Sequence, residues 1–181
     1  MTTATAGASS STERSGAVTF KGNPLTLIGP EIKVGSKAPN FEVLSQDLSG
    51  ITLDTFKGKN LLISVVPSLD TPVCDAQTRR FNQEAATLPN IAILTVGMDL
   101  PFAQKRWCAG AGVNNLQTGS DHRDASFGKA YGVLIKELRL LSRSIFLIDR
   151  NGIIKYIEYV PEVTSHPNYD AAVAAARSLA A

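Results

Sequence analysis

The sequence has few of the features that mark nucleic-acid-binding, membrane or metal proteins. Its 181 residues carry 18 basic and 16 acidic side chains, so the formal net charge is only +2. A chain this close to neutral has no cationic surplus with which to hold a phosphate backbone, and nucleic acid is not an expected partner. No run approaches the roughly 18 uninterrupted apolar residues that a transmembrane helix needs, so no association with a membrane is expected.

Only two cysteines and two histidines occur, which excludes a disulfide scaffold and a structural zinc site. A disulfide framework needs more cysteines. His122 and His166 are distant in the sequence from both cysteines and from each other, without the short spacing of zinc ligands. We therefore expect neither a metal nor a cofactor. Cys74 and Cys108 are then either two inert buried thiols or a pair with a chemical use.

A secretory signal is also missing. Residues 1–17 are rich in Ser, Thr and Ala and lack the basic start and apolar run of a signal peptide. We interpret them as a flexible tail. Residues 18–181 have an even composition, no visible repeat and enough length for a sizeable core, which predicts one domain. Without a signal, the expected location is the cytoplasm.

The apolar residues, 44% of the chain, follow the pattern of an α/β domain. Residues 61–66 form a continuous apolar run, typical of a strand buried on both faces, and a helical apolar period follows over 74–88. The other predicted elements are an N-terminal β-hairpin at 18–20 and 25–27, strands at 41–44, 51–53, 91–96, 144–149 and 153–159, and helices at 101–109, 125–131 and 170–181. This order predicts a central mixed sheet with helices on both faces, as in a thioredoxin-like fold.

The segment from Pro67 to Cys74 joins a predicted strand to a predicted helix, which is where open α/β sheets bind ligands. Thr71 is a suitable N-cap residue, and Pro72 suits the first helical position. Cys74 then falls in the first turn, where free backbone N–H groups and the helix dipole favour an anion. The position therefore favours the thiolate of Cys74. The alternative is a small apolar residue on the buried face of the helix.

A cation near this cysteine would strengthen that preference, because an ordinary thiol is only a few per cent thiolate at neutral pH. Arg79, Arg80 and Arg143 are the candidates. Cys108 lies 34 residues after Cys74, at a helix end weakened by two nearby glycines, so fraying could let its thiol approach Cys74. A disulfide over such a loop would stabilise the fold by roughly 3.5 to 4 kcal/mol. The alternative, which the residues by themselves favour, is a buried thiol beside the neighbouring tryptophan.

The stretch Pro67-Ser68-Leu69-Asp70-Thr71-Pro72-Val73-Cys74 resembles the active-site signature of bacterial thiol peroxidases, the atypical two-cysteine peroxiredoxins with a thioredoxin-like fold. Pro-x-x-x-Thr-x-x-Cys is typical of peroxiredoxins, and a second cysteine 34 residues later, near a Pro-Phe-Ala-Gln run, is typical of this subfamily. The similarity covers about residues 18 to 181. It continues through Arg79-Arg80-Phe81-Asn82, residues 98–104, Arg106-Trp107-Cys108, Leu141-Ser142-Arg143 and Asn168-Tyr169-Asp170.

The resemblance implies a role for each matched residue. Cys74 would be the peroxidatic nucleophile, which attacks a peroxide oxygen as thiolate and leaves as sulfenic acid. Arg143 would sit over the thiolate and donate hydrogen bonds to the peroxide, and the Thr71 hydroxyl would orient the O–O bond. Pro67 would shield the sulfur from water. The backbone N–H groups of Val73 and Cys74 would stabilise the developing oxyanion.

The resemblance also implies substrates and partners. Cys108 would resolve the sulfenic acid of Cys74 as an intrachain disulfide, which thioredoxin would then reduce. The substrates would be hydrogen peroxide and organic hydroperoxides, reduced to water or alcohols without a cofactor. A homodimer is the expected assembly.

Two other functions use the same residues. One is a cysteine hydrolase with Cys74 as the acylated nucleophile and His122 as its base. The other is a redox-sensing or binding module in which a regulatory Cys74–Cys108 disulfide switches a partner surface. Taken singly, Thr71 could be only a helix cap and Arg143 only a solvated charge at a strand edge.

Overall fold

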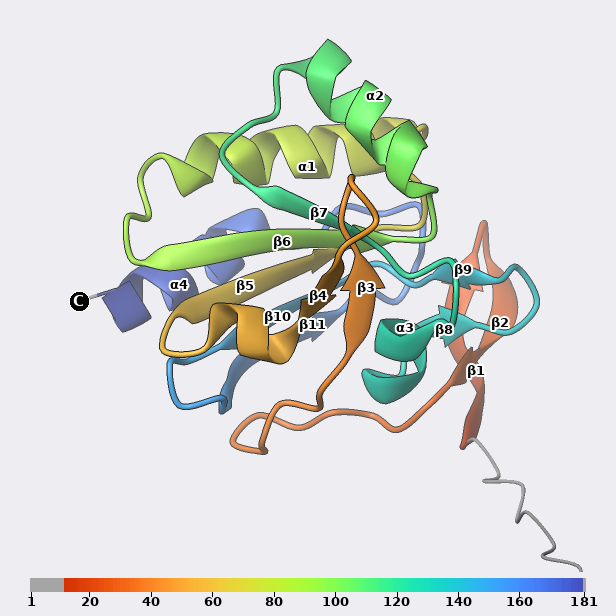
Figure 1. The fold of residues 1–181 in the computed structure, drawn as a ribbon. Coiled ribbons are helices and arrows are strands. Elements are labelled where there is room, and N and C mark those ends of the chain that lie inside the picture. Colours follow the sequence, from red (N-terminus) through yellow and green to blue (C-terminus); the bar gives the residue numbers. More distant parts are fainter. Residues whose placement is uncertain (1–11, 181) are drawn as a thin grey trace, which may run out of the picture.

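A seven-stranded sheet forms the centre of the computed structural model, which describes residues 12–180 (Figure 1). The strand order is β11-β10-β5-β6-β7-β3-β4. Strands β5, β6 and β7 run parallel, and the other pairings are antiparallel, so the predicted mixed sheet is confirmed. The strands are β3 (Glu42–Leu44), β4 (Gly50–Thr52), β5 (Asn60–Val65), β6 (Ile91–Gly97), β7 (Gln117–Ser120), β10 (Ser144–Ile148) and β11 (Ile154–Tyr159).

Helices cover both faces of this sheet, as the element order predicts. They are α1 (Pro72–Ala85), α2 (Pro101–Ala111), α3 (Ser126–Ala130), α4 (Tyr169–Ala180) and the 3-10 helix η1 (Leu53–Phe56). One core joins α1 and α4 to the face of the sheet that carries Leu62 and Ile93. The other face carries Leu61 and Ile63, which pack with α3 and η1 in a second core. Strand β5 is buried along its whole length, because its side chains alternate between these two cores.

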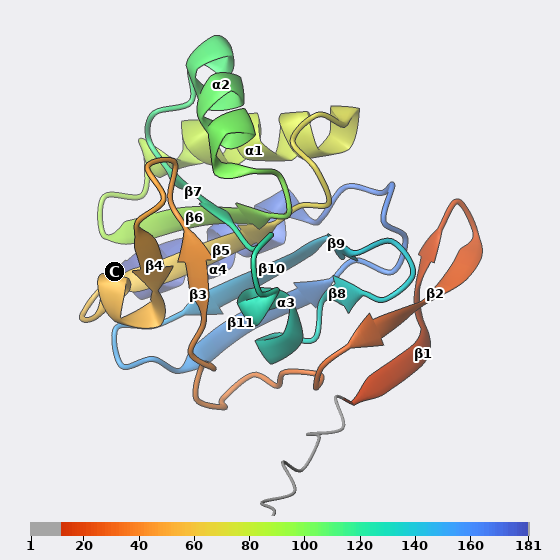
Figure 2. The same cartoon turned by 45° about the vertical axis from the view of Figure 1, so that its right-hand side comes forward.

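A second, four-stranded sheet begins with the predicted N-terminal hairpin and lies beside the main sheet (Figure 2). Its order is β1-β2-β8-β9, with the strands β1 (Glu13–Phe20), β2 (Asn23–Ile28), β8 (Leu134–Ile135) and β9 (Leu140–Leu141). The turn of the hairpin uses positive φ angles at Lys21 and Gly22. This sheet encloses a small core around Val18 and Leu27.

Strand β1 starts earlier than the sequence indicates. Residues 13–17, expected in the flexible tail, belong to the strand, so that boundary of the expectation is corrected. Arg14 explains the difference, because its guanidinium donates to the carbonyl oxygens of Gly29 and Gly132 and lies over the ring of Tyr159. The expected tail over residues 1–11 lies outside the described residues. Within residues 12–180, no helix combines the length and the apolar character that crossing a membrane requires.

Candidate active site

Cys74 occupies the first turn of α1, as the sequence predicts. The helix begins at Pro72 with Thr71 as the N-cap residue, which places Cys74 at the third helical position. The strand that leads into this turn, β5, lies in the middle of the sheet between β10 and β6. The Cys74 side chain is 0% exposed and packs with Val66 and Leu69. Its position therefore combines burial with the positive end of a helix dipole.

The Thr71 side chain does not act as a helix cap, although the residue stands at the N-cap position. Its hydroxyl oxygen lies 2.8 Å from Cys74 Sγ and 2.8 Å from the carbonyl oxygen of Ser68. A hydroxyl has one proton, so it can donate to only one of these acceptors at a time. Thr71 itself is exposed. The interpretation of Thr71 as only a cap is thus wrong, and its hydroxyl connects the buried sulfur to the surface.

Arg143 lies between β9 and β10 and approaches Cys74 from the other side. Its Nη2 is 3.4 Å from Cys74 Sγ, and only 2% of the residue is exposed. Its remaining donors reach the carbonyl oxygen of Val163, at 3.1 Å from Nε and 3.0 Å from Nη2, and Gln77 Oε1, at 2.7 Å from Nη1. The interpretation of Arg143 as a solvated strand-edge charge is therefore wrong.

The charge environment of Arg143 is unusual for a buried guanidinium. Among the ion pairs of residues 12–180, none includes Arg143. A buried charge is costly unless an opposite charge or several hydrogen bonds compensate it. Val163 and Gln77 supply neutral acceptors, and Cys74 is the contacting group that can ionise to an anion. The buried guanidinium therefore places a positive charge directly beside the Cys74 sulfur.

The other two candidate cations point elsewhere. Arg79 forms an ion pair with Asp75 at 2.9 Å, and its guanidinium lies 5.7 Å from the centroid of the Trp107 ring. Arg80 pairs with Glu84 at 2.9 Å. Of the three arginines that the sequence offered, Arg143 is the one that contacts the sulfur.

Gln77 is a site residue that the sequence analysis missed. It lies three residues after Cys74 on α1 and is fully buried. Its Oε1 accepts from Arg143, while its Nε2 donates to Ser64 Oγ at 2.8 Å. The available signal was the helical spacing, because residues three apart share one face of a helix. Gln77 thereby ties Arg143 to the central strand β5.

Asp99 supports the loop before the helix and was also missed as a site residue. It follows β6, and its carboxylate accepts from Ser68 Oγ at 2.7 Å and from the Leu69 N–H at 2.8 Å. Pro67, at the start of this loop, is buried. Val73 occupies the second helical position, where backbone N–H groups have no acceptor within the helix.

Cys108 lies on α2 in different surroundings. Both cysteines are free buried thiols. Burial raises the pKa of Cys108, and the polar side chains of Thr118 and Gln46 next to it offset part of this effect. Gln46 Nε2 donates to Thr118 Oγ1 at 2.9 Å, and both residues line a cavity of about 410 Å³. The structure therefore gives the two cysteines separate sets of polar neighbours and does not bring them together as a disulfide.

The two histidines make local contacts, and neither is hydrogen-bonded to Cys74. His122 Nδ1 lies 2.9 Å from Ser120 Oγ, and His166 Nδ1 lies 2.7 Å from the Tyr169 hydroxyl. The side-chain hydrogen bonds of the Cys74 sulfur go to Thr71 and Arg143. A cysteine hydrolase with His122 as base lacks the contact it needs, so this alternative is not supported.

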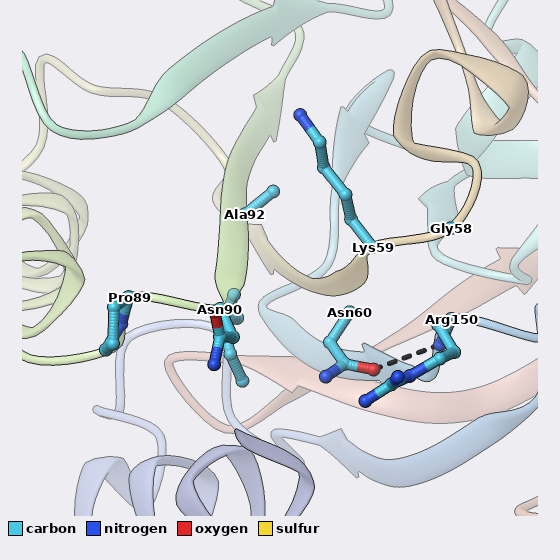
Figure 3. Close-up of a pocket in the computed structure, with 8 residues that line it drawn as sticks. Gly58, Lys59, Asn60, Pro89, Asn90, Ala92 and Arg150 are labelled. Atoms are coloured by element: carbon cyan, nitrogen blue, oxygen red, sulfur yellow. Dashed lines mark hydrogen bonds between the residues drawn. The ribbon is translucent and has the colours of Figure 1, made fainter. Parts of the chain in front are cut away.

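Another cavity, of about 520 Å³, lies away from both cysteines, where β5 and β6 begin (Figure 3). Asn60 in its wall accepts from the Arg150 N–H at 3.0 Å. The side chains of Lys59 and Arg150 extend in different directions in Figure 3 and do not converge on a common point. This cavity therefore offers no assembled site. Among residues 12–180, no group of three His, Cys, Asp or Glu side chains is arranged to hold a metal ion.

Comparisons with known proteins agree with this geometry. The family model described as Redoxin matches residues 33–173. A thiol peroxidase of Halalkalibacterium halodurans is 64% identical over 161 residues, covering 89% of this chain and 97% of that protein. A thiol peroxidase of Bacillus subtilis is 57% identical over 162 residues, covering 90% and 97%. The crystal structure of a peroxiredoxin-like protein from Aquifex aeolicus superposes with a TM-score of 0.84 at 44% identity, covering 90% of this chain and 96% of that one.

Proposed function

Because this chain belongs to the redoxin family and, within it, to the thiol peroxidases, we propose that it reduces hydrogen peroxide and organic hydroperoxides at Cys74. The observation that carries the proposal is the contact of the buried Arg143 guanidinium with Cys74 Sγ. No carboxylate within residues 12–180 forms an ion pair with this arginine, so the thiolate is its natural counter-ion. The Thr71 hydroxyl, on the same sulfur, adds a second donor.

In the first step, the Cys74 thiolate attacks one peroxide oxygen. The S–O bond forms as the O–O bond breaks, and the leaving oxygen takes a proton from solvent to become water or an alcohol. Cys74 is oxidised to sulfenic acid. Arg143, Thr71 and the backbone N–H groups of Val73 and Cys74 donate to the developing negative charge. Pro67 limits the access of water to the sulfur.

In the second step, Cys108 attacks the sulfenic sulfur of Cys74. The S–S bond forms, and hydroxide leaves and takes up the thiol proton as water. Because Cys108 is buried beside Gln46 and Thr118, the end of α2 has to leave its place first. Gly110, inside the last turn of α2, weakens that end, because glycine is a poor helix former.

A thiol reductant returns the enzyme to its starting state, as the family requires. We propose thioredoxin as this reductant, a homodimer as the assembly and the cytoplasm as the location. All three are supported by the similarity to thiol peroxidases. The alternative, a redox-sensing module, shares the oxidation chemistry but not the repeated turnover that the relatives' name describes.

The test is the intact mass of the reduced protein after one equivalent of hydrogen peroxide. A loss of about 2 Da per chain is expected, because joining two thiols removes two hydrogens. The Cys108→Ser variant should instead gain about 16 Da as sulfenic acid. The Cys74→Ser variant should keep its mass and should show no turnover with thioredoxin and thioredoxin reductase. An unchanged mass of the wild-type protein, or a Cys74→Ser variant that still consumes peroxide, would contradict the proposal.

A further inference from the structure

The carbonyl oxygen of Val163 helps to fix the direction of the Arg143 guanidinium. It accepts from both Nε and Nη2, at 3.1 and 3.0 Å. Nη2 is also the atom that contacts Cys74 Sγ. In the described part of the chain no carboxylate pairs with Arg143, so the position of this carbonyl group, together with Gln77, controls where the guanidinium lies relative to the sulfur. The loop that carries Val163 follows strand β11.

The N-terminal hairpin holds this loop through the backbone of Thr19. The Thr19 N–H donates to the carbonyl oxygen of Pro161 at 2.8 Å, and the Thr19 carbonyl oxygen accepts from the Val163 N–H at 2.9 Å. These two bonds make a short parallel bridge between β1 and the loop. The Val163 side chain is buried with Val18 and Leu27 in the small core of the second sheet. Strand β1 of the hairpin therefore holds the backbone segment whose carbonyl group accepts from Arg143.

The Glu162 carboxylate connects the same two segments. On the hairpin it accepts from Thr19 Oγ1 at 2.7 Å, from the Lys21 N–H at 3.0 Å and from the Gly22 N–H at 3.1 Å. On its own loop it accepts from the Thr164 hydroxyl at 2.7 Å and the Thr164 N–H at 3.1 Å. These donors hold the pKa of Glu162 well below its usual range, so the carboxylate is charged whenever the protein is folded near neutral pH. Five donors from two chain segments meet on one side chain.

We propose that Thr19 and Glu162 are positioning residues for Arg143, through the bridge between strand β1 and the loop of residues 161–165. Neither residue touches the sulfur, and both act through the Val163 carbonyl group. The inference rests on the proposed function of Arg143. Reactions that depend on oriented groups lose rate steeply when one group moves by about 1 Å, so a loosened loop should slow the oxidation of Cys74.

The experiment compares Thr19→Val, which removes the hydroxyl at nearly constant volume, with Thr19→Ser, which keeps it. The rate of oxidation by hydrogen peroxide is followed by the fluorescence of Trp107, the one tryptophan of the chain. Its ring packs against the buried group of Val66, Leu69 and Cys74. We expect Thr19→Val to react about tenfold more slowly, with its rate–pH profile moved to higher pH because the thiolate loses part of its contact with the cation. Thr19→Ser should restore both the rate and the profile.

Two further variants make the result specific. Thr26→Val changes a threonine on β2 whose hydroxyl makes no hydrogen bond to the loop of residues 161–165, and it should react like the wild-type protein. Glu162→Gln should slow oxidation as Thr19→Val does, and it provides the same test if Thr19→Val fails to fold. An equal loss of rate in Thr26→Val would show a general effect of the hairpin and overturn the inference.

The outcome also separates this inference from the proposed function. If Thr19→Val and Glu162→Gln keep the wild-type rate and pH profile while Arg143→Met is slow, the positioning role is wrong and the peroxidatic site stands. If Arg143→Met also keeps the wild-type rate, the proposed role of Arg143 itself is wrong.

Discussion

Cys74 and Cys108 are both buried free thiols on helices, but their surroundings differ in charge. Cys74 lies in the first turn of α1 and contacts a guanidinium and a hydroxyl. Cys108 lies near the end of α2 beside the neutral side chains of Gln46 and Thr118, and burial raises its pKa. Burial is therefore common to the two thiols, and the charge of the neighbouring groups is what differs between them.

The helix dipoles reinforce this difference. Cys74 is at the third position of its helix, at the positive end of the dipole. Cys108 is three residues before the last residue of α2, Ala111, where the dipole is negative and disfavours a thiolate. In the proposed function, Cys74 attacks as an anion, whereas Cys108 stays a thiol until its helix opens. Three changes test this comparison.

The largest effect is expected when the cation beside Cys74 is removed. In Arg143→Met, the sulfur loses its counter-ion and one donor to the developing charge. Loss of such a donor costs about 10²- to 10³-fold in rate, and we expect the oxidation of Cys74 by hydrogen peroxide to slow by that factor. The rate is measured by stopped-flow fluorescence of Trp107.

A matched control is Arg123→Met. Arg123 is an exposed arginine that pairs with Glu42 and Asp124 at 2.9 Å each and has no contact with either cysteine, so its loss should leave the rate unchanged. Arg143→Lys should remain slow, because an ammonium group cannot reproduce the three contacts of the guanidinium. A wild-type rate in Arg143→Met would remove the distinction between the two cysteines.

A smaller effect is expected on the Cys108 side. Thr118→Val removes the hydroxyl that accepts from Gln46 and lies beside the Cys108 thiol. The interaction of this hydroxyl with the Cys108 thiol is the one that holds α2. One hydrogen bond contributes about 1 kcal/mol, so opening of α2 should become roughly fivefold more frequent. Disulfide formation should speed up by that factor, while the preceding oxidation of Cys74 keeps its rate. The two steps are resolved as successive phases of Trp107 fluorescence.

The same variant should gain less mass from overoxidation in excess peroxide, because the sulfenic acid is consumed sooner. Gln46→Leu should act in the same direction. Gln117→Leu is the control, since Gln117 is an exposed neighbour on β7 and should change neither phase. Slower disulfide formation in Thr118→Val would mean that its hydroxyl assists Cys108 rather than restrains it.

The sequence predicts the position of Cys74 better than it predicts which cation lies beside it. The pair Thr71-Pro72 places Cys74 in the first turn, because both residues favour the start of a helix. The choice of Arg143 among three arginines could not be made locally, since its contact with Cys74 spans 69 residues and depends on how β10 pairs with β5. Only the resemblance to thiol peroxidases singled it out.

Three other features depend on contacts that no local pattern reveals. Strand β7, with the sequence Gln-Thr-Gly-Ser, has no apolar alternation and was not predicted; it is a strand because β6 and β3 pair with it on either side. The early start of β1 depends on Arg14, whose carbonyl partner in Gly132 lies 118 residues away. In the sequence, Gln77 looks like any polar residue of a helix. Only the folded chain shows that it is buried against Arg143.

The smallest effect concerns the acidity of Cys108, measured in Cys74→Ser, where it is the one remaining thiol. Because burial raises its pKa above the ordinary 9.0, the ultraviolet absorbance of the thiolate should appear at higher pH in the folded protein than in urea. The native state then binds the proton more tightly than the unfolded state, so the free energy of unfolding should fall as the pH rises above about 9. A variant with both Cys74→Ser and Cys108→Ser should lack this fall. Ionisation at the same pH in the folded and unfolded states would show that burial does not raise the pKa of Cys108, and the contrast between the two cysteines would then rest on the surroundings of Cys74.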